Sequence, residues 1–582
     1  MISTSMDLSL KARSPAYALA ATALTRYWGA AVVVALALLV WAPRFSGPID
    51  LRWDGGVYYL LGTSLAQGHG YRIPSEPGSP EALQYPPLLP AAIALCERVL
   101  GTADPDVVAP WLRKLYAGLF VVYALAILAL ARRYLRPGFA VIAAALCLLQ
   151  VMTIFLSDLL FAELPFALVS VVFALVALNG NSSLRPWLRE AGSFGLASAA
   201  FLLRTAGLAL LGAWVLDAIV RRRWRLVAVR SVLALLPIVA WQVYVVRVRG
   251  SEEYAHPAYE YQRAPYQYYN VSYAENLFLV DPFRPELGSM NARTLAWRVI
   301  ENLPSMSVAV GETVSTRKGY WLQVITRSQK RLLGRLVIPE ETVFIPILML
   351  AALVVVGAVV LVRRKAWLIA FIVLGSLGLT CVTPWPAQFT RYLAGAAPFL
   401  AICALLGFSL IHTALADRRP GITALRMAMV GLLALAFVME GFSATKMFWQ
   451  RWKKEARTVA TKSEQSGSPL FFHDRTWQTW EETASWISAH APPDAIVATS
   501  APHFFYLRTG MRAILPPMEA DPERARRLLE MVPASYVIID GLDFVDISRR
   551  YARPAVESDP AGWRVVCSKD KTKTYARVVG TK

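Results

Sequence analysis

Long apolar runs separated by short polar segments dominate the sequence. A run of roughly 17–25 apolar residues is long enough to cross a bilayer as one helix. Runs of about this kind occupy residues 28–43, 111–131, 138–156, 159–178, 228–247, 342–362, 366–383, 393–414 and 421–441. The pattern predicts a polytopic α-helical membrane protein.

Short basic clusters between the runs predict the orientation, because cytoplasmic loops are enriched in Lys and Arg. The basic cluster at residues 221–225 lies on the same side as Arg185 and Arg189 only if an even number of crossings separates them. We therefore expect residues 192–220 to form a hairpin of two short helices that turns near Arg204. The prediction is about eleven membrane segments with a cytoplasmic N-terminus.

Composition agrees with this class. The chain has 582 residues, of which 56% are apolar and 17% charged, and its net charge is +20. The basic residues lie between apolar runs, as topology determinants do, so the charge indicates a lipid bilayer as partner and not nucleic acid. Five scattered cysteines form no metal-type pair and no disulfide framework.

The predicted topology leaves three large segments outside, at residues 44–110, 250–340 and 442–582. The middle one is rich in tyrosine, which favours anchoring at the lipid headgroups over stacking on sugars. In the last, an amphipathic helix near residues 477–487 and strands near 495–499, 536–539 and 563–566 predict a small α/β domain. We therefore expect a membrane module at residues 1–441 and a periplasmic domain at residues 442–582.

Asp54 follows the first apolar run and is the leading candidate for a catalytic residue. It has a simpler interpretation as the N-cap of a short amphipathic helix that ends at Gly68. Further polar residues lie at the ends of other runs on the same predicted outer face, where charges are costly unless they are paired or hydrated. They are Tyr58, Tyr85, Asp158, Glu163, Arg204, Arg391 and Tyr392.

One reaction suits carboxylates and arginines at a lipid boundary: attack of an acceptor hydroxyl on a sugar whose leaving group is a lipid phosphate. A positioned carboxylate takes the proton of the hydroxyl, and we assign this role to Asp54. Fixed cations stabilise the departing phosphate, which Arg391 and Arg204 can provide. Asp158 has the alternative role of helix cap, and either arginine alone could be a helix-end residue that reaches for the headgroups.

At these residues the chain resembles the GT-C superfamily of polytopic glycosyltransferases, in particular the protein O-mannosyltransferases and lipid A aminoarabinose transferases. The resemblance covers residues ~28 to ~415 and rests on motifs that occur in the same order. These are Asp54 with Tyr58, Leu65, Gly68, Gly70 and Tyr71, then Tyr85-Pro86-Pro87, Glu163-Leu164-Pro165-Phe166, Leu203-Arg204-Thr205-Ala206-Gly207-Leu208 and Arg391-Tyr392-Leu393.

The resemblance implies a polyprenyl-phosphate sugar as donor, a catalytic Asp54, and contact of Arg391 and Tyr392 with the donor phosphate. Tyr58, Tyr85, Asp158 and Glu163 are then expected in the substrate and acceptor pocket. The acceptor would be a glycan, lipid or protein at the periplasmic face of a bacterial inner membrane.

Two departures bear on substrate and metal. Gly55 stands where many relatives have a second acid, and Tyr85 where aminoarabinose transferases have lysine. Some members of the superfamily use a divalent metal, but His69 and the scattered acids form no clear ligand set. A transporter or flippase of lipid-linked sugars, and a noncatalytic envelope-assembly protein, remain as alternatives.

Reporter fusions test the predicted topology. A reporter fused at Trp224 is expected inside, and one fused at the C-terminus outside. Location of both reporters on the same side would contradict the hairpin at Arg204.

Overall fold

The computed structural model describes residues 15–179, 185–334, 339–415, 420–460, 474–542 and 546–578. Helices occupy all of the predicted membrane segments, which confirms the predicted fold class. They are α1 Pro15–Trp41, α4 Pro105–Ala131, α5 Pro137–Leu149, α6 Val151–Asp158, α7 Glu163–Ala177, α8 Pro186–Leu203, α9 Leu208–Val220, α10 Trp224–Arg249, α15 Phe344–Arg363, α16 Trp367–Val382, α18 Ala397–Ala414 and α19 Pro420–Ala460.

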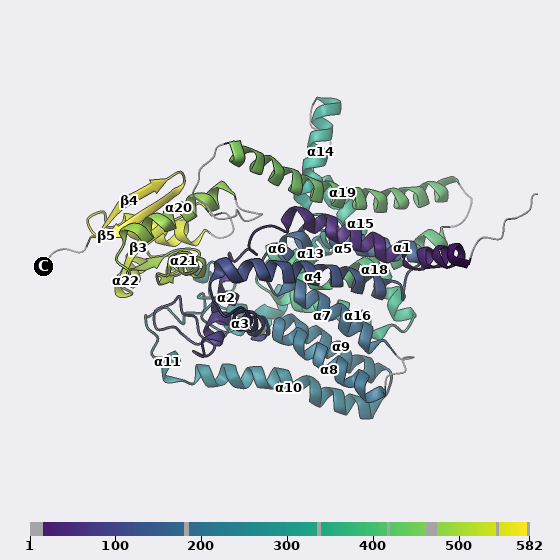
Figure 1. Cartoon of the computed structure of the whole chain (residues 1–582), viewed down its shortest axis with the longest axis horizontal. Helices are drawn as coiled ribbons and strands as arrows, with labels where there is room; N and C mark the ends of the chain where they lie inside the picture. The colour runs from purple at the N-terminus through teal and green to yellow at the C-terminus, as the bar shows by residue number, and fades with distance from the viewer. Residues whose placement is uncertain are drawn as a thin grey trace, which may run out of the picture.

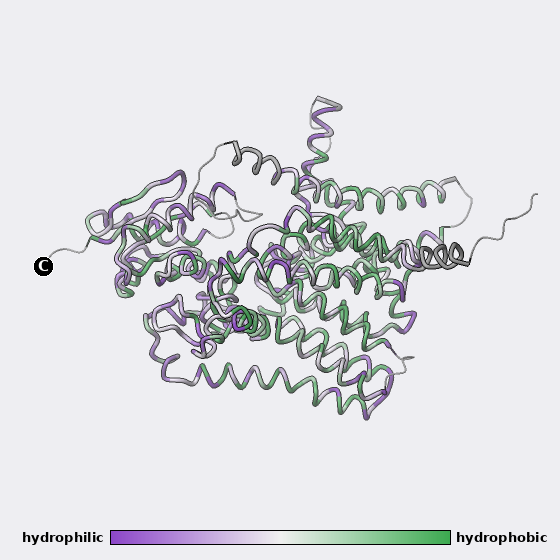
Figure 2. The backbone as a smooth tube through the Cα atoms, in the orientation of Figure 1, coloured by the Kyte–Doolittle hydropathy of each residue, from purple (hydrophilic) through white to green (hydrophobic). Residues whose placement is uncertain are grey.

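These helices lie side by side and are apolar along most of their length (Figures 1 and 2). In the described part of the chain, 6 helices are long and apolar enough to cross a membrane, and α5 with α6 forms a further candidate bent by 54°. The helices α7, α9 and α16 are apolar but shorter.

The predicted break at Arg204 is present. Helix α8 ends at Leu203, the backbone of Arg204 is extended, and α9 begins at Leu208 after a single 3-10 turn. The loop between α9 and α10 lies at the end of the bundle away from the C-terminal sheet (Figure 1), as the predicted hairpin requires. One continuous helix through this region is therefore excluded.

Small residues bring helices α15 and α18 into backbone contact. A Cβ atom added at Gly357 would overlap the carbonyl of Cys403, and one added at Gly407 would overlap the carbonyl of Leu353. Because apolar side chains gain little from meeting each other in lipid, close approach through small residues is a main source of helix association in membranes.

The three segments predicted to lie outside, called the outer segments below, contain shorter helices and a sheet. In the first two segments these are α2 Asp54–Ala66, α3 Leu88–Leu100, α11 Glu252–Ala255, α12 Tyr273–Leu277, α13 Ala292–Thr313 and α14 Lys318–Leu333. The C-terminal part contains α20 Arg475–His490, β1 Ile496–Ala498, α21 Pro502–Thr509, β2 Ala513–Ile514, α22 Pro522–Met531, β3 Ala534–Ile539, α23 Arg553–Glu557, β4 Trp563–Lys569 and β5 Thr572–Arg577.

The C-terminal strands form one mixed sheet in the order β2-β1-β3-β5-β4. Strand β1 pairs in parallel with β2 and β3, whereas β5 is antiparallel to both β3 and β4. The predicted helix and three strands are confirmed as α20, β1, β3 and β4, while β2 and β5 were not predicted. The domain boundary after residue 441 stays a prediction, and α19 continues past it to Ala460.

Headgroup anchoring is wrong for several of the tyrosines in the middle segment. Tyr259, Tyr261 and Tyr269 are buried, the first two in a hydrophobic cluster with residues of the C-terminal sheet. The hydroxyl of Tyr259 donates a 2.5 Å hydrogen bond to Glu76 of the first outer segment. These tyrosines therefore join the three outer segments to one another.

The burial of Glu76 predicts a pH dependence of stability. Burial raises the pKa of Glu76 to about 7 from its ordinary value of 4.5, against the opposing effect of its hydrogen bonds. A raised folded pKa means that the stabilisation is complete below about pH 4.5 and is lost as the pH rises to about 7.

The unfolding temperature of the wild type should therefore fall over this range relative to that of Glu76→Gln. The exposed Glu301 offers a matched control, since Glu301→Gln should keep the wild-type profile. Parallel profiles for the wild type and Glu76→Gln, measured by thermal unfolding in detergent, would contradict the assignment.

Candidate active site

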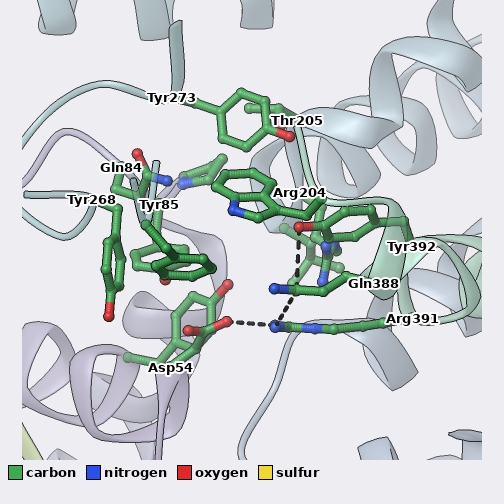
Figure 3. A pocket seen from close by; sticks show the side chains of 15 residues that line it. Asp54, Gln84, Tyr85, Arg204, Thr205, Tyr268, Tyr273, Gln388, Arg391 and Tyr392 are labelled. Atoms are coloured by element: carbon green, nitrogen blue, oxygen red, sulfur yellow. Dashed lines mark hydrogen bonds and ion pairs between the residues drawn. The ribbon is translucent and has the colours of Figure 1, made fainter. Parts of the chain in front are cut away.

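Asp54 is the first residue of α2, and its carboxylate does not cap the helix. Trp53 occupies the N-cap position without a side-chain cap bond, and nearly all of the helix is buried from Gly55 to Ser64, so the expected amphipathic pattern is absent. The carboxylate instead contacts the guanidinium of Arg391, 337 residues further along the chain (Figure 3). The capping interpretation of Asp54 is therefore wrong.

Arg391 lies on the short helix α17 Phe389–Tyr392, between α16 and α18. Its Nη2 pairs with Asp54 Oδ2, and its Nε donates to Glu163 Oε1 at 2.7 Å. Its guanidinium also lies 4.6 Å from the ring centroid of Phe161. One arginine thus connects two carboxylates from separate helices.

Glu163 and Arg204 extend this contact into a chain of alternating charges. Glu163 is the first residue of α7, and its Oε1 pairs with Arg204 as well as with Arg391. Its side chain is 4% exposed, whereas Arg204 and Arg391 are 18% and 21% exposed. Glu163 therefore lies behind the two arginines and holds them together, while the arginines reach the cavity.

The cavity in front of these charges has a volume of about 130 Å³, and seven of its fifteen lining residues are aromatic. The rings of Tyr58 and Tyr85 lie 4.7 Å apart between centroids. The structure places six predicted residues along the cavity: Asp54, Tyr58, Tyr85, Arg204, Arg391 and Tyr392. Side chains from four distant parts of the sequence therefore converge there (Figure 3).

Several cavity residues were not predicted. Gln388 accepts from Arg391 Nη1 at 3.4 Å and from the Tyr392 hydroxyl at 3.3 Å, and the others contribute mainly rings. They include Gln84, Tyr268, Tyr273, Phe283, Trp385 and Gln388. Trp385 and Gln388 could have been predicted from their position next to Arg391 in the sequence. No local sequence pattern distinguishes Tyr268 and Tyr273 from the buried tyrosines nearby.

Asp158 is not in this cavity. It is fully buried at the end of α6, where its Oδ1 accepts from Arg113 at 2.8 Å and lies 3.9 Å from Arg44. Arg113 Nε also donates to the carbonyl of Pro48 at 2.8 Å. Both its expected place in the substrate pocket and its expected capping role are therefore wrong, since it ties the first outer segment to the bundle.

Gly55, which directly follows Asp54, lies close to other parts of the backbone. A Cβ atom there would lie 3.1 Å from the carbonyl of Asp50 and 3.6 Å from Leu160 Cβ. The backbone at residue 55 therefore packs closely against Asp50 and Leu160.

The site does not fit a divalent metal. The carboxylates of Asp54 and Glu163 are already paired with arginines, which compete for the same oxygens. Within the described ranges, no group of three or more His, Cys, Asp or Glu side chains is arranged to hold a metal ion.

The segment before Asp54 is held by the C-terminal domain. Trp53 has a φ of 54°, a backbone conformation that residues other than glycine rarely adopt. Its ring packs edge-on against Trp477 of α20 with centroids 5.6 Å apart, and the Arg52 guanidinium lies 4.9 Å from the Trp477 ring. A Cβ atom at Gly56 would lie 3.3 Å from His503 Cβ of α21. Helices α20 and α21 therefore support the first turn of α2.

Comparison with known proteins found similar structures but no similar sequence. No family model matches the sequence, and no curated protein matches it by sequence. Among solved structures, the oligosaccharyltransferase AglB from Archaeoglobus fulgidus, in complex with an inhibitory peptide and a dolichol-phosphate, is similar with a TM-score of 0.51 and 14% identity over 95% of this chain and 75% of that chain.

A second similar structure is ArnT from Cupriavidus metallidurans bound to undecaprenyl phosphate. It has a TM-score of 0.48 and 14% identity, over 94% of this chain and 98% of that chain. At 14% identity, the similarity to the AglB structure shows the fold alone, and it confirms the expected GT-C-like fold of this chain.

Proposed function

We propose that the protein is a membrane glycosyltransferase that moves a sugar from a polyprenyl-phosphate donor to an acceptor hydroxyl at the outer face of the membrane. The observation that carries this proposal is the contact between Asp54 and Arg391 in an aromatic cavity. A base and a phosphate-binding cation are the two groups that the reaction needs side by side.

The arginines account for the donor phosphate. Arg391 and Arg204 both reach the cavity and share a single buried counter-ion, Glu163. A donor phosphate would compete with Asp54 for Arg391, because both are anions that bind the same guanidinium. The dolichol-phosphate in the similar AglB structure supports a lipid phosphate as the donor class.

The release of Asp54 from Arg391 then prepares the reaction. The freed carboxylate takes the proton of the acceptor hydroxyl as the hydroxyl oxygen attacks the anomeric carbon. A new glycosidic bond forms while the bond from the sugar to the phosphate oxygen breaks, and the negative charge of the departing phosphate falls on Arg391 and Arg204. A base without a carboxylate nucleophile implies inversion at the anomeric carbon.

The aromatic wall suits the sugar and the lipid boundary. Ligand cavities typically combine ring surfaces with a few placed polar groups. Tyr268, Tyr273 and Trp385 supply ring surfaces, and Gln84 and Gln388 supply amides that can orient hydroxyl groups. The proposal leaves the identity of the sugar and the acceptor open.

The Asp54→Asn variant tests the proposed base. It keeps the shape of the side chain but removes the proton acceptor, so transfer should slow by about 10²–10⁴-fold. The assay follows the loss of sugar from lipid-linked donors extracted from the host membrane.

The exposed Asp494 before β1 provides the control, and Asp494→Asn should transfer at the wild-type rate. Normal transfer by Asp54→Asn would show that the proposed base is wrong.

The contact between Trp53 and Trp477 predicts a positioning effect on Asp54. Trp477→Ala removes the ring that supports the strained residue before Asp54, so kcat should fall by about 10- to 100-fold with little change in the KM for donor. Trp477→Phe keeps a ring at this place and should restore much of kcat.

Ile487 is a control on the same helix. It is fully buried, so Ile487→Ala should also destabilise the C-terminal domain. If the two alanine variants lost stability and kcat in equal proportion, the effect of Trp477 would be general destabilisation and not positioning.

A further inference from the structure

A second, larger cavity lies behind the segment that carries Arg391. Its volume is about 810 Å³, and its walls come from α13, the start of α14, the start of α15 and α19. Residues 385–392 separate it from the catalytic cavity: Pro386, Ala387 and Thr390 face the second cavity, whereas Trp385, Gln388, Arg391 and Tyr392 face the first. The proposed reaction uses none of the groups in this second cavity.

The second cavity is basic. Arg317, Lys318 and Lys446 line it together with one acid, Glu312. Glu312 Oε1 accepts the backbone N–H of Lys318 at 2.6 Å. In the described part of the chain, no carboxylate forms an ion pair with any of the three cationic side chains within 4.0 Å, which leaves an excess of positive charge in the cavity.

Aromatic and apolar side chains surround these cations. Lys446 Nζ lies 5.1 Å from the ring centroid of Tyr320, and Lys318 Nζ lies 5.9 Å from that of Phe344. Ile345 and Phe442, which adjoin the cavity in sequence at α15 and α19, are exposed on helices that are apolar enough to cross the membrane. The cavity therefore combines cations with neighbouring lipid-facing surface.

Helix α14 extends this basic character outward. It leaves the bundle across the direction of the long helices (Figure 1), which would place it along the plane of the membrane. Arg327, Lys330 and Arg331 are exposed on it, and its sequence contains no acid. Basic amphipathic helices of this kind bind anionic membrane surfaces through their Lys and Arg side chains.

We propose that the second cavity binds the phosphate headgroup of an anionic phospholipid from the surrounding membrane. Lys318, Lys446 and Arg317 contact the phosphate, and the acyl chains lie along the exposed apolar faces of α15 and α19. The site is separate from the donor site and does not depend on the proposed glycosyl transfer. It brings a membrane lipid next to Thr390 and hence to the segment that positions Arg391.

Lipid titration tests the site with the full chain in detergent. Phosphatidylglycerol is added to the wild type and to Lys318→Gln/Lys446→Gln, and bound lipid is counted by native mass spectrometry. The double variant should bind phosphatidylglycerol about tenfold more weakly, because it removes two of the three cations. Phosphatidylcholine, whose headgroup has no net charge, should bind weakly to both proteins.

Two control variants show whether the lipid binds in this cavity. Lys571→Gln/Lys573→Gln removes the same charge from the exposed hairpin of the C-terminal sheet and should bind phosphatidylglycerol as the wild type does. Gln84→Leu changes the wall of the first cavity but no residue that lines the second, and it should also leave this binding unchanged.

Equal binding by the wild type and the Lys318/Lys446 variant would overturn the proposal. Displacement of the lipid by millimolar inorganic phosphate would also overturn it, since that result would identify a site for a free anion. Thermal unfolding of each variant confirms that the proteins compared are folded.

Discussion

The pairing of four charged side chains at one end of an apolar bundle is the constraint on which this structure depends. Asp54, Arg391 and Glu163 come from three separate helices and Arg204 from the break after α8, and their charges alternate in sign. An unpaired charge in such a place is expensive, and removal of one partner from a buried pair leaves the other uncompensated. The same contacts that make the charges tolerable therefore fix α2, α7, α8 and α17 relative to one another.

Buried carboxylates occur in two different surroundings in this structure. Glu163 pairs with both arginines from behind, and this contact does not depend on Asp54. Asp158 shows the contrasting case, in which a buried carboxylate between Arg113 and Arg44 has no access to the cavity and serves to fasten the outer segment. The difference lies in what each carboxylate faces, not in its distance from the end of a helix.

The outer segments complete the site from the other side. Ser75 Oγ lies 2.8 Å from His503 Nδ1, and the Ala513 N–H donates to the Ser75 carbonyl at 3.0 Å, so the C-terminal domain is bound directly to the first outer segment. Together with the packing of Trp477 on Trp53, these contacts hold the backbone before Asp54. The C-terminal domain is thus part of the support for Asp54.

Hydropathy predicted the helices because each span is long enough for its own sequence to determine its structure. The break at Arg204 was predicted from the basic cluster at residues 221–225. Asp54, Arg204 and Arg391 stood out because a charge next to lipid is costly unless it is paired or hydrated. Asp158 was misplaced because its partners, Arg44 and Arg113, are distant in sequence. Tyr259 and Tyr268 have similar local sequence but opposite surroundings, one in the core and the other at the cavity, and only tertiary contacts distinguish them. The short strand β2 contains two residues, too few for any periodic signal.

The most direct test of the central claim, that these paired charges act on a lipid-phosphate sugar, is mass spectrometry of the lipids in cells that lack the protein. The account predicts that a polyprenyl-phosphate sugar accumulates and that expression of the wild-type chain removes it. An unchanged profile of polyprenyl-phosphate sugars in the absence of the protein would contradict the account.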